Sequence, residues 1–140
     1  MSESLRHIAL GVIQNNGEVL VVRRQEIEEG LNGETLTYVF PGGKVENNET
    51  VQQSVVREVL EESGYHIQVI SMIDEGQHPT FPAYMSYLEC KLVSAEVSPT
   101  KDGGIAEVRW VSISDFPKII TSSLNDKVKA HLGLWVIYAR

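Results

Sequence analysis

Apolar and polar positions alternate in short runs along most of the chain. Such runs, rich in β-branched and aromatic residues and bounded by Gly, Pro and Asn, predict strands. The predicted strands are His7–Gln14, Glu18–Arg24, Thr35–Phe40, His66–Asp74, Tyr84–Ala95 and Ala106–Val111. Asn15-Asn16-Gly17 predicts a hairpin turn between the first two, and loops are expected at Gln25–Glu34, Gly76–Thr80 and Ser98–Gly104.

In two segments, apolar residues recur at helical rather than strand spacing. Thr50 is the predicted N-cap of a helix that runs to about Ser63, with Gly64 just past its end. The apolar arc of this helix, its predicted buried stripe, holds Val51, Val55, Val56, Val59 and Leu60. From Ser123 onwards, Leu124, Val128, Leu132 and Trp135 or Val136 predict a C-terminal amphipathic helix, and Ser114–Pro117 predicts a short helical turn. Strands interleaved with helices indicate a mixed sheet with helices on its faces.

Length and composition indicate one globular domain. The chain has 140 residues, of which 42% are apolar, and no apolar run reaches the roughly 20 residues that span a bilayer. The polar start lacks the basic and apolar regions of a secretory signal. The single cysteine, Cys90, lies in a predicted strand and is expected to be a buried structural thiol. These features favour a reducing cytoplasm.

The charge balance narrows the class of partner. Twelve basic and nineteen acidic residues give a net charge of −7, which argues against binding to a nucleic-acid backbone. An acidic protein that handles an anionic substrate needs a bridging cation.

Three carboxylates gather on the predicted helix. Glu58, Glu61 and Glu62 fall on a flank beside the buried stripe, which should face a cleft edge. Like charges at these spacings repel one another by a few tenths of a kcal/mol each, and a divalent cation such as Mg²⁺, which prefers oxygen ligands, would remove that cost. A solvated acidic helix face is the alternative. The preceding Arg57 and the earlier Pro41-Gly42-Gly43 turn favour the metal site.

The segment Gly43–Tyr65 resembles the Nudix box. That motif is a Gly, five residues, Glu, seven residues, then Arg-Glu-apolar-any-Glu-Glu-any-Gly-apolar. Its positions correspond here to Gly43, Glu49, Arg57, Glu58, Val59, Glu61, Glu62, Gly64 and Tyr65. Tyr65 stands where an aliphatic residue is usual, and an aromatic ring can also pack there. Phe40-Pro41-Gly42-Gly43 and Glu107–Val111 also resemble family features.

The resemblance implies a single Nudix domain over residues 1–140, with a mixed β-sheet between helices in an α/β/α sandwich. It implies Mg²⁺, with Mn²⁺ able to substitute, held by Glu58, Glu61, Glu62 and the Gly43 carbonyl. It also implies a salt bridge between Glu49 and Arg57, and water activated by the metal to attack phosphorus. Three carboxylates stay open as the general base: Glu61, Glu62 and, outside the box, Glu107, for which a surface position is an equal alternative.

Other candidates for substrate contact are weaker. Arg23 and Arg24 end a strand, and because neighbouring strand residues point to opposite sides, at most one should face the site. Tyr38 and Phe40 could stack a base, although core packing is the better explanation. His78 could contact substrate from a loop, and Glu46 could help to hold metal, although an ordinary surface role fits each at least as well.

The leading hypothesis is an enzyme that hydrolyses a nucleoside triphosphate to a monophosphate and pyrophosphate. An ADP-ribose or nucleotide-sugar pyrophosphatase is the alternative, which Pro79, fifteen residues past Gly64, weakly supports; such members often carry an N-terminal extension, which is short here. A non-catalytic nucleotide sensor is the alternative of another class, and the intact carboxylate set counts against it. Family habit also implies a homodimer, and no binding to a membrane or nucleic acid is expected.

Overall fold

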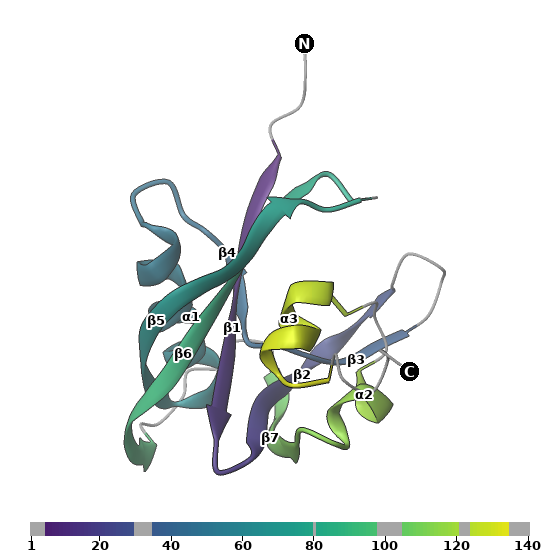
Figure 1. Ribbon diagram of the computed structural model, residues 1–140. Helices are drawn as coiled ribbons and strands as arrows, with labels where there is room; N and C mark the ends of the chain where they lie inside the picture. Colours follow the sequence, from purple (N-terminus) through teal and green to yellow (C-terminus); the bar gives the residue numbers. More distant parts are fainter. Residues whose placement is uncertain (1–4, 30–34, 80, 98–104, 121–123, 135–140) are drawn as a thin grey trace.

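The computed structural model describes residues 5–29, 35–79, 81–97, 105–120 and 124–134. Within these residues seven strands and three helices follow one another along the chain (Figure 1). In chain order they are β1 (Arg6–Asn15), β2 (Glu18–Glu29), β3 (Thr35–Val39), β4 (Gly42–Lys44), α1 (Val51–Ser63), β5 (Tyr65–Gln77), β6 (Ala83–Val97), β7 (Ile105–Ser112), α2 (Phe116–Ile119) and α3 (Asp126–His131).

The described strands form one mixed sheet. Its order is β3-β2-β1-β6-β5, with β4 paired to β1 and β7 paired to β2. β1 runs parallel to β6, whereas the other pairs are antiparallel. β1 and β2 join through the predicted hairpin, where Asn16 and Gly17 both take positive φ. β1 therefore lies at the junction between the two halves of the sheet.

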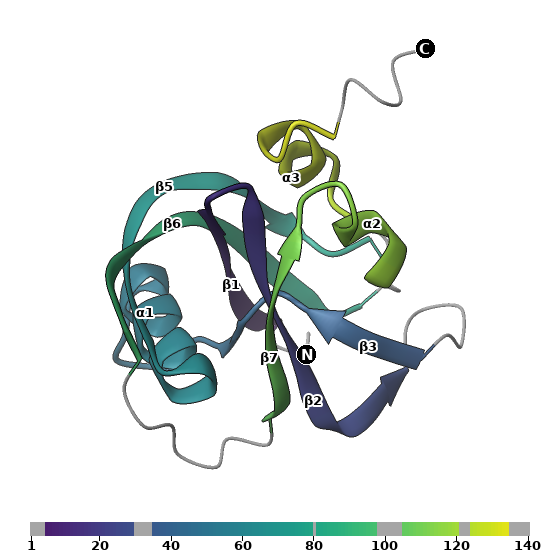
Figure 2. The same cartoon turned by 90° about the horizontal axis from the view of Figure 1, so that it is seen from below.

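Helices cover both faces of this sheet. α1 lies on one side, within the curve of β5 and β6, while α2 and α3 lie on the other side of β1 (Figure 2). The α1 side packs a core that includes Ala9, Leu20, Val55 and Val59. The opposite side packs a second core, whose buried members include Val12, Val21, Phe40, Phe116 and Val128. The predicted α/β/α sandwich is confirmed.

Local signals at both ends of α1 act as the sequence predicts. The Thr50 hydroxyl accepts a hydrogen bond from the backbone N–H of Gln53, and the side-chain oxygen of Gln53 accepts one from the Thr50 backbone N–H, which completes a capping box. Gly64 ends the helix in the left-handed region at φ 82°.

The buried face of α1 is rotated from the predicted stripe. Val55 and Val59 are buried as expected, but Val56 is exposed, with 38% of its surface accessible. Ser54, Glu62 and Ser63 are buried instead. The sheet covers the side of the helix that carries Glu62, so this carboxylate lies in the packed interface and not on the flank beside it.

Most predicted strands are confirmed, and the errors lie at their ends. The predicted loops at Gln25–Glu34 and Gly76–Thr80 are partly wrong, because β2 continues to Glu29 and β5 continues to Gln77. The short strand β4 was not predicted. The predicted C-terminal helix is shorter than expected: α3 ends at His131, and Gly133 follows at φ 79°. Trp135, Val136 and the loop Ser98–Gly104 lie outside the described residues.

Cys90 is a buried strand residue, and burial raises the pKa of its thiol to about 12. The thiol is therefore protonated and packed, as the sequence predicts. None of the helices in the described part of the chain has the length and apolar character needed to span a bilayer.

Candidate active site

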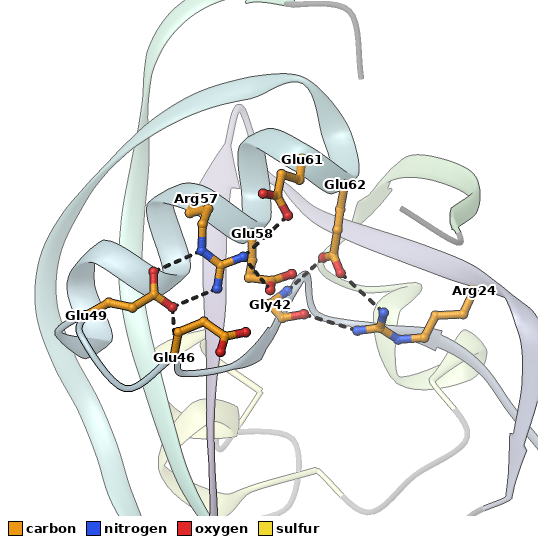
Figure 3. A network of polar contacts seen from close by, with 8 residues as sticks. All are labelled: Arg24, Gly42, Glu46, Glu49, Arg57, Glu58, Glu61 and Glu62. Atoms are coloured by element: carbon orange, nitrogen blue, oxygen red, sulfur yellow. Dashed lines mark hydrogen bonds and ion pairs between the residues drawn. The ribbon is translucent and has the colours of Figure 1, made fainter. Parts of the chain in front are cut away.

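Two glycines bring the chain against the acidic side of α1. A Cβ on Gly42, whose φ is 146°, would lie 2.2 Å from the Ala9 carbonyl oxygen, so only glycine fits there. A Cβ on Gly43 would meet the Glu58 carboxylate carbon at 3.1 Å. The short strand β4 can therefore place its backbone directly beside Glu58 (Figure 3).

Arg57 ties the loop before α1 to the helix. Its Nε and Nη2 donate to the two oxygens of Glu49 at 2.9 and 2.7 Å. Its Nη1 reaches Glu58 at 2.9 Å and Glu61 at 3.4 Å. Hydrogen bonds from Arg57 and from the Glu46 backbone lower the pKa of Glu49 to about 2, which keeps this carboxylate ionised. The salt bridge implied between Glu49 and Arg57 is confirmed.

Glu62 lies in a closed ring of hydrogen bonds that joins three elements. The Gly42 backbone N–H donates to Glu62 Oε1 at 2.9 Å, and Arg24 Nη1 donates to Oε2 at 3.2 Å. Arg24 Nη2 also donates to the Gly42 carbonyl at 3.1 Å. Burial raises the pKa of Glu62 to about 7, even though Arg24 and the Gly42 N–H favour the charged form. The ring fixes the start of β4 against the end of α1.

Arg23 contacts a different carboxylate. Its Nε donates to Glu107 Oε1 at 3.3 Å, and the Tyr38 hydroxyl donates to the same oxygen at 2.6 Å. The Arg109 guanidinium lies over the Tyr38 ring, 5.6 Å from its centre. The hydrogen bonds from Tyr38 and Arg23 lower the pKa of Glu107. Arg24 contacts a box carboxylate and Arg23 does not, which agrees with the prediction that at most one of them faces the site.

Of the remaining candidates, Phe40 and His78 lie apart from the box, and Glu46 lies in its loop. Phe40 is buried and stacks on Phe116 with ring centres 5.1 Å apart, so it is a core residue and not a base platform. His78 lies before β6, where its Nδ1 accepts from the Phe81 backbone at 3.2 Å and its ring lies against Phe81. Glu46 lies in the loop beside Glu49 (Figure 3).

The donor chemistry of the box suits Mg²⁺, which takes carboxylate and carbonyl oxygens. Glu58 and Glu62 lie beside β4, whose glycines leave room for a close approach. As the side chains lie, however, no three acidic, histidine or cysteine residues in the described part form a group able to hold a metal ion. The carboxylates are turned towards Arg57 and Arg24. The residues fit the ion by donor type and by their closeness to β4, and to hold it the carboxylates would have to turn away from the arginines.

Sequence reasoning missed the contact between Arg24 and Gly42. The sequence does not distinguish Arg24 from Arg23, and it indicates only a turn at Gly42. The Pro41-Gly42-Gly43 segment directly before the box was the available signal, because paired glycines often mark a close backbone approach.

The sequence matches a family model and curated proteins. The model of the NUDIX domain matches residues 5–132. A putative nudix hydrolase 1 of Caenorhabditis elegans is 28% identical over 120 residues, which cover 82% of this chain and 31% of that protein. The 8-oxo-dGTP diphosphatase of Escherichia coli is 41% identical over 72 residues, covering 51% of this chain and 53% of that protein. The matches thus span about a third and about half of these two relatives.

Solved structures show the same fold. The crystal structure of a NUDIX hydrolase from Nitrosomonas europaea superposes with a TM-score of 0.77 at 21% identity, covering 95% of this chain and 73% of that one. Because the family model covers most of the chain and the fold agrees, the chain belongs to the Nudix family.

Proposed function

We propose that this chain is a Mg²⁺-dependent hydrolase that cuts a pyrophosphate linkage in a nucleotide. The observation that carries the proposal is the packing of the Glu58 and Glu62 carboxylates against the Gly42–Gly43 backbone, with Arg57 holding the loop in place. Acidic side chains and backbone oxygens then converge on one edge of α1, where a hard cation and a diphosphate can meet.

The polar residues of the box and Gly43 have distinct roles in this proposal. Glu58, Glu61, Glu62 and the Gly43 carbonyl hold Mg²⁺, or Mn²⁺ in its place. The ion supplies a more acidic water and offsets charge on the phosphate oxygens. Arg57 and Glu49 position Glu58 through their salt bridge.

The general base is one of three carboxylates: Glu61, Glu62 or Glu107. Glu61 is the most exposed of the three glutamates on α1, with 42% of its side chain accessible, and its contact with Arg57 is 3.4 Å long. Glu62 is buried in its ring, and Glu107 is bonded to Tyr38 and Arg23. These contacts favour Glu61, which is best able to turn to a water.

A nucleoside triphosphate, cleaved to a monophosphate and pyrophosphate, is the proposed substrate. The similarity to the 8-oxo-dGTP diphosphatase of Escherichia coli, 41% over 72 residues, supports it. ADP-ribose is the second candidate. Pro79 and a 35% identity over 69 residues to the ADP-ribose pyrophosphatase of Methanocaldococcus jannaschii support this alternative.

The proposed location is the cytoplasm, because a buried free Cys90 fits a reducing compartment. The proposed oligomeric state is a homodimer, which rests on family habit alone.

A nucleotide screen with Mg²⁺ tests the proposed activity. Triphosphates should release pyrophosphate, whereas ADP-ribose should be cut more slowly or not at all. Activity should stop with a chelator and return with Mg²⁺. In ¹⁸O-labelled water the label should enter a phosphate product, because attack is at phosphorus. Turnover that survives the chelator, or label confined to a sugar or base fragment, would reject the mechanism.

A further inference from the structure

The buried carboxylate of Glu62 already has partners at both oxygens. Oε1 accepts from the Gly42 N–H and Oε2 accepts from Arg24. Only 4% of the Glu62 side chain is accessible, against 27% of the Arg24 side chain. The carboxylate is therefore buried, whereas the guanidinium side chain is partly exposed to solvent. The guanidinium comes from β2 and lies across Glu62 and the Gly42 carbonyl (Figure 3).

This arrangement places a fixed positive charge where the proposed cation has to bind. A divalent ion that uses Glu62 Oε2 meets the Arg24 guanidinium at hydrogen-bond distance from the same atom, and two cations so close repel each other strongly. Breaking the pair without a replacement would leave a buried, uncompensated carboxylate, which is costly. The ion and Arg24 are therefore alternative partners of one oxygen.

Arg57 is placed differently. Two of its nitrogens are bound to both oxygens of Glu49, whose side chain is largely buried. Its contacts with Glu58 and Glu61 come from the third nitrogen alone. Arg57 can lose these contacts and keep its salt bridge to Glu49. Arg24 differs, because the carboxylate that it binds, Glu62, is itself a proposed metal ligand.

We propose that Arg24 is a built-in counter-ion that competes with the divalent cation for Glu62 and so sets how tightly the metal binds. Arg24 acts through Glu62 and is a positioning residue. When the ion binds, the guanidinium leaves Glu62, and the Gly42 carbonyl loses its partner as well. The inference rests on the proposed function, because it assumes the metal site at Glu58 and Glu62.

The test is a titration of the full chain with Mn²⁺ and no nucleotide, followed by electron paramagnetic resonance. Arg24→Met should lower the Kd for Mn²⁺ by about tenfold, because a positive charge next to the ligand is removed. After treatment with a chelator, the same variant should show a lower Tm than the wild type, because Glu62 has lost its counter-ion.

The neighbouring arginine is the matched control. Arg23→Met removes the same charge one residue away, but from Glu107 rather than Glu62. Its Kd for Mn²⁺ should stay within about twofold of the wild type, since that charge is more distant and screened. In a Glu62→Gln background, Arg24→Met should no longer tighten binding. If Arg24→Met fails to fold, Arg24→Gln, which keeps a donor without the charge, should tighten binding in the same direction.

Two results would overturn the inference: wild-type or weaker Mn²⁺ binding in the Arg24 variant that folds, or equal tightening by Arg23→Met. Failure of the proposed function looks different. In that case Glu58→Gln and Glu62→Gln leave Mn²⁺ binding unchanged. If those two variants weaken binding while the Arg24 variant has no effect, the metal site stands and only the competition is refuted.

Discussion

Glu62→Gln is expected to lower kcat by at least about a hundredfold, which corresponds to about 3 kcal/mol of transition-state stabilisation. A neutral amide is a poor ligand for a hard dication, so the charge that holds the metal is lost. The amide keeps the shape of Glu62 and can still accept from the Gly42 N–H. Steady-state kinetics with Mg²⁺, together with circular dichroism of the variant, would measure both effects.

Glu75→Gln is the control for this change, because Glu75 is an exposed residue of β5 outside the box. It should leave kcat unchanged. A Glu62→Gln enzyme that turns over at a rate close to the wild type would show that Glu62 does not act as a metal ligand.

Gly42→Ala is expected to lower the free energy of unfolding by about 3 kcal/mol or more. The added Cβ would lie 2.2 Å from the Ala9 carbonyl oxygen and 2.8 Å from Leu10 Cα, both backbone atoms of β1 that cannot move without breaking the β1–β4 pairing. The φ of 146° adds backbone strain for any residue with a side chain. Urea denaturation of the purified variant would give the loss.

The comparison for Gly42 is Gly17→Ala. Gly17 also has a positive φ, 78°, but a Cβ there meets nothing within 4 Å. Its cost should therefore be limited to the left-handed conformation, about 1 kcal/mol. If both variants lose the same free energy of unfolding, the close packing of β4 on β1 is not the reason that position 42 requires glycine.

The elements that local chemistry determines could be predicted from the sequence. Thr50, Gln53 and Gly64 mark the two ends of α1 within a few residues of the backbone groups they satisfy. The Asn16-Gly17 turn is equally local. β4 could not be predicted, because three residues with two glycines carry no periodicity and the strand exists through its pairing with β1.

Long-range packing explains the error on α1, and a glycine explains the early end of α3. The helical wheel placed Val56 in the buried stripe and Glu62 on the flank beside it, but the position of the sheet leaves Val56 exposed and buries Glu62. In α3 the apolar spacing continues past Leu132, but Gly133 takes φ 79° and the helix stops before it.

In the candidate site, too, the sequence predicted the local contact and not the long-range one. The salt bridge between Glu49 and Arg57 spans eight residues within one motif, and the resemblance to the Nudix box implied it. The contact between Arg24 and Glu62 joins residues 38 positions apart, from β2 and α1. Strand alternation could say only that at most one of Arg23 and Arg24 faces the box, and the fold decides which one.

The most direct test of the metal site is a crystal grown with Mn²⁺ and a non-hydrolysable nucleotide, measured at a wavelength where Mn²⁺ scatters anomalously. The expected anomalous peak lies between the carboxylates of Glu58 and Glu62, with the diphosphate beside it and Arg24 turned away from Glu62. A peak elsewhere, with Glu62 still bonded to Arg24 and Glu58 still bonded to Arg57, would contradict the proposal that this helix edge holds the catalytic cation.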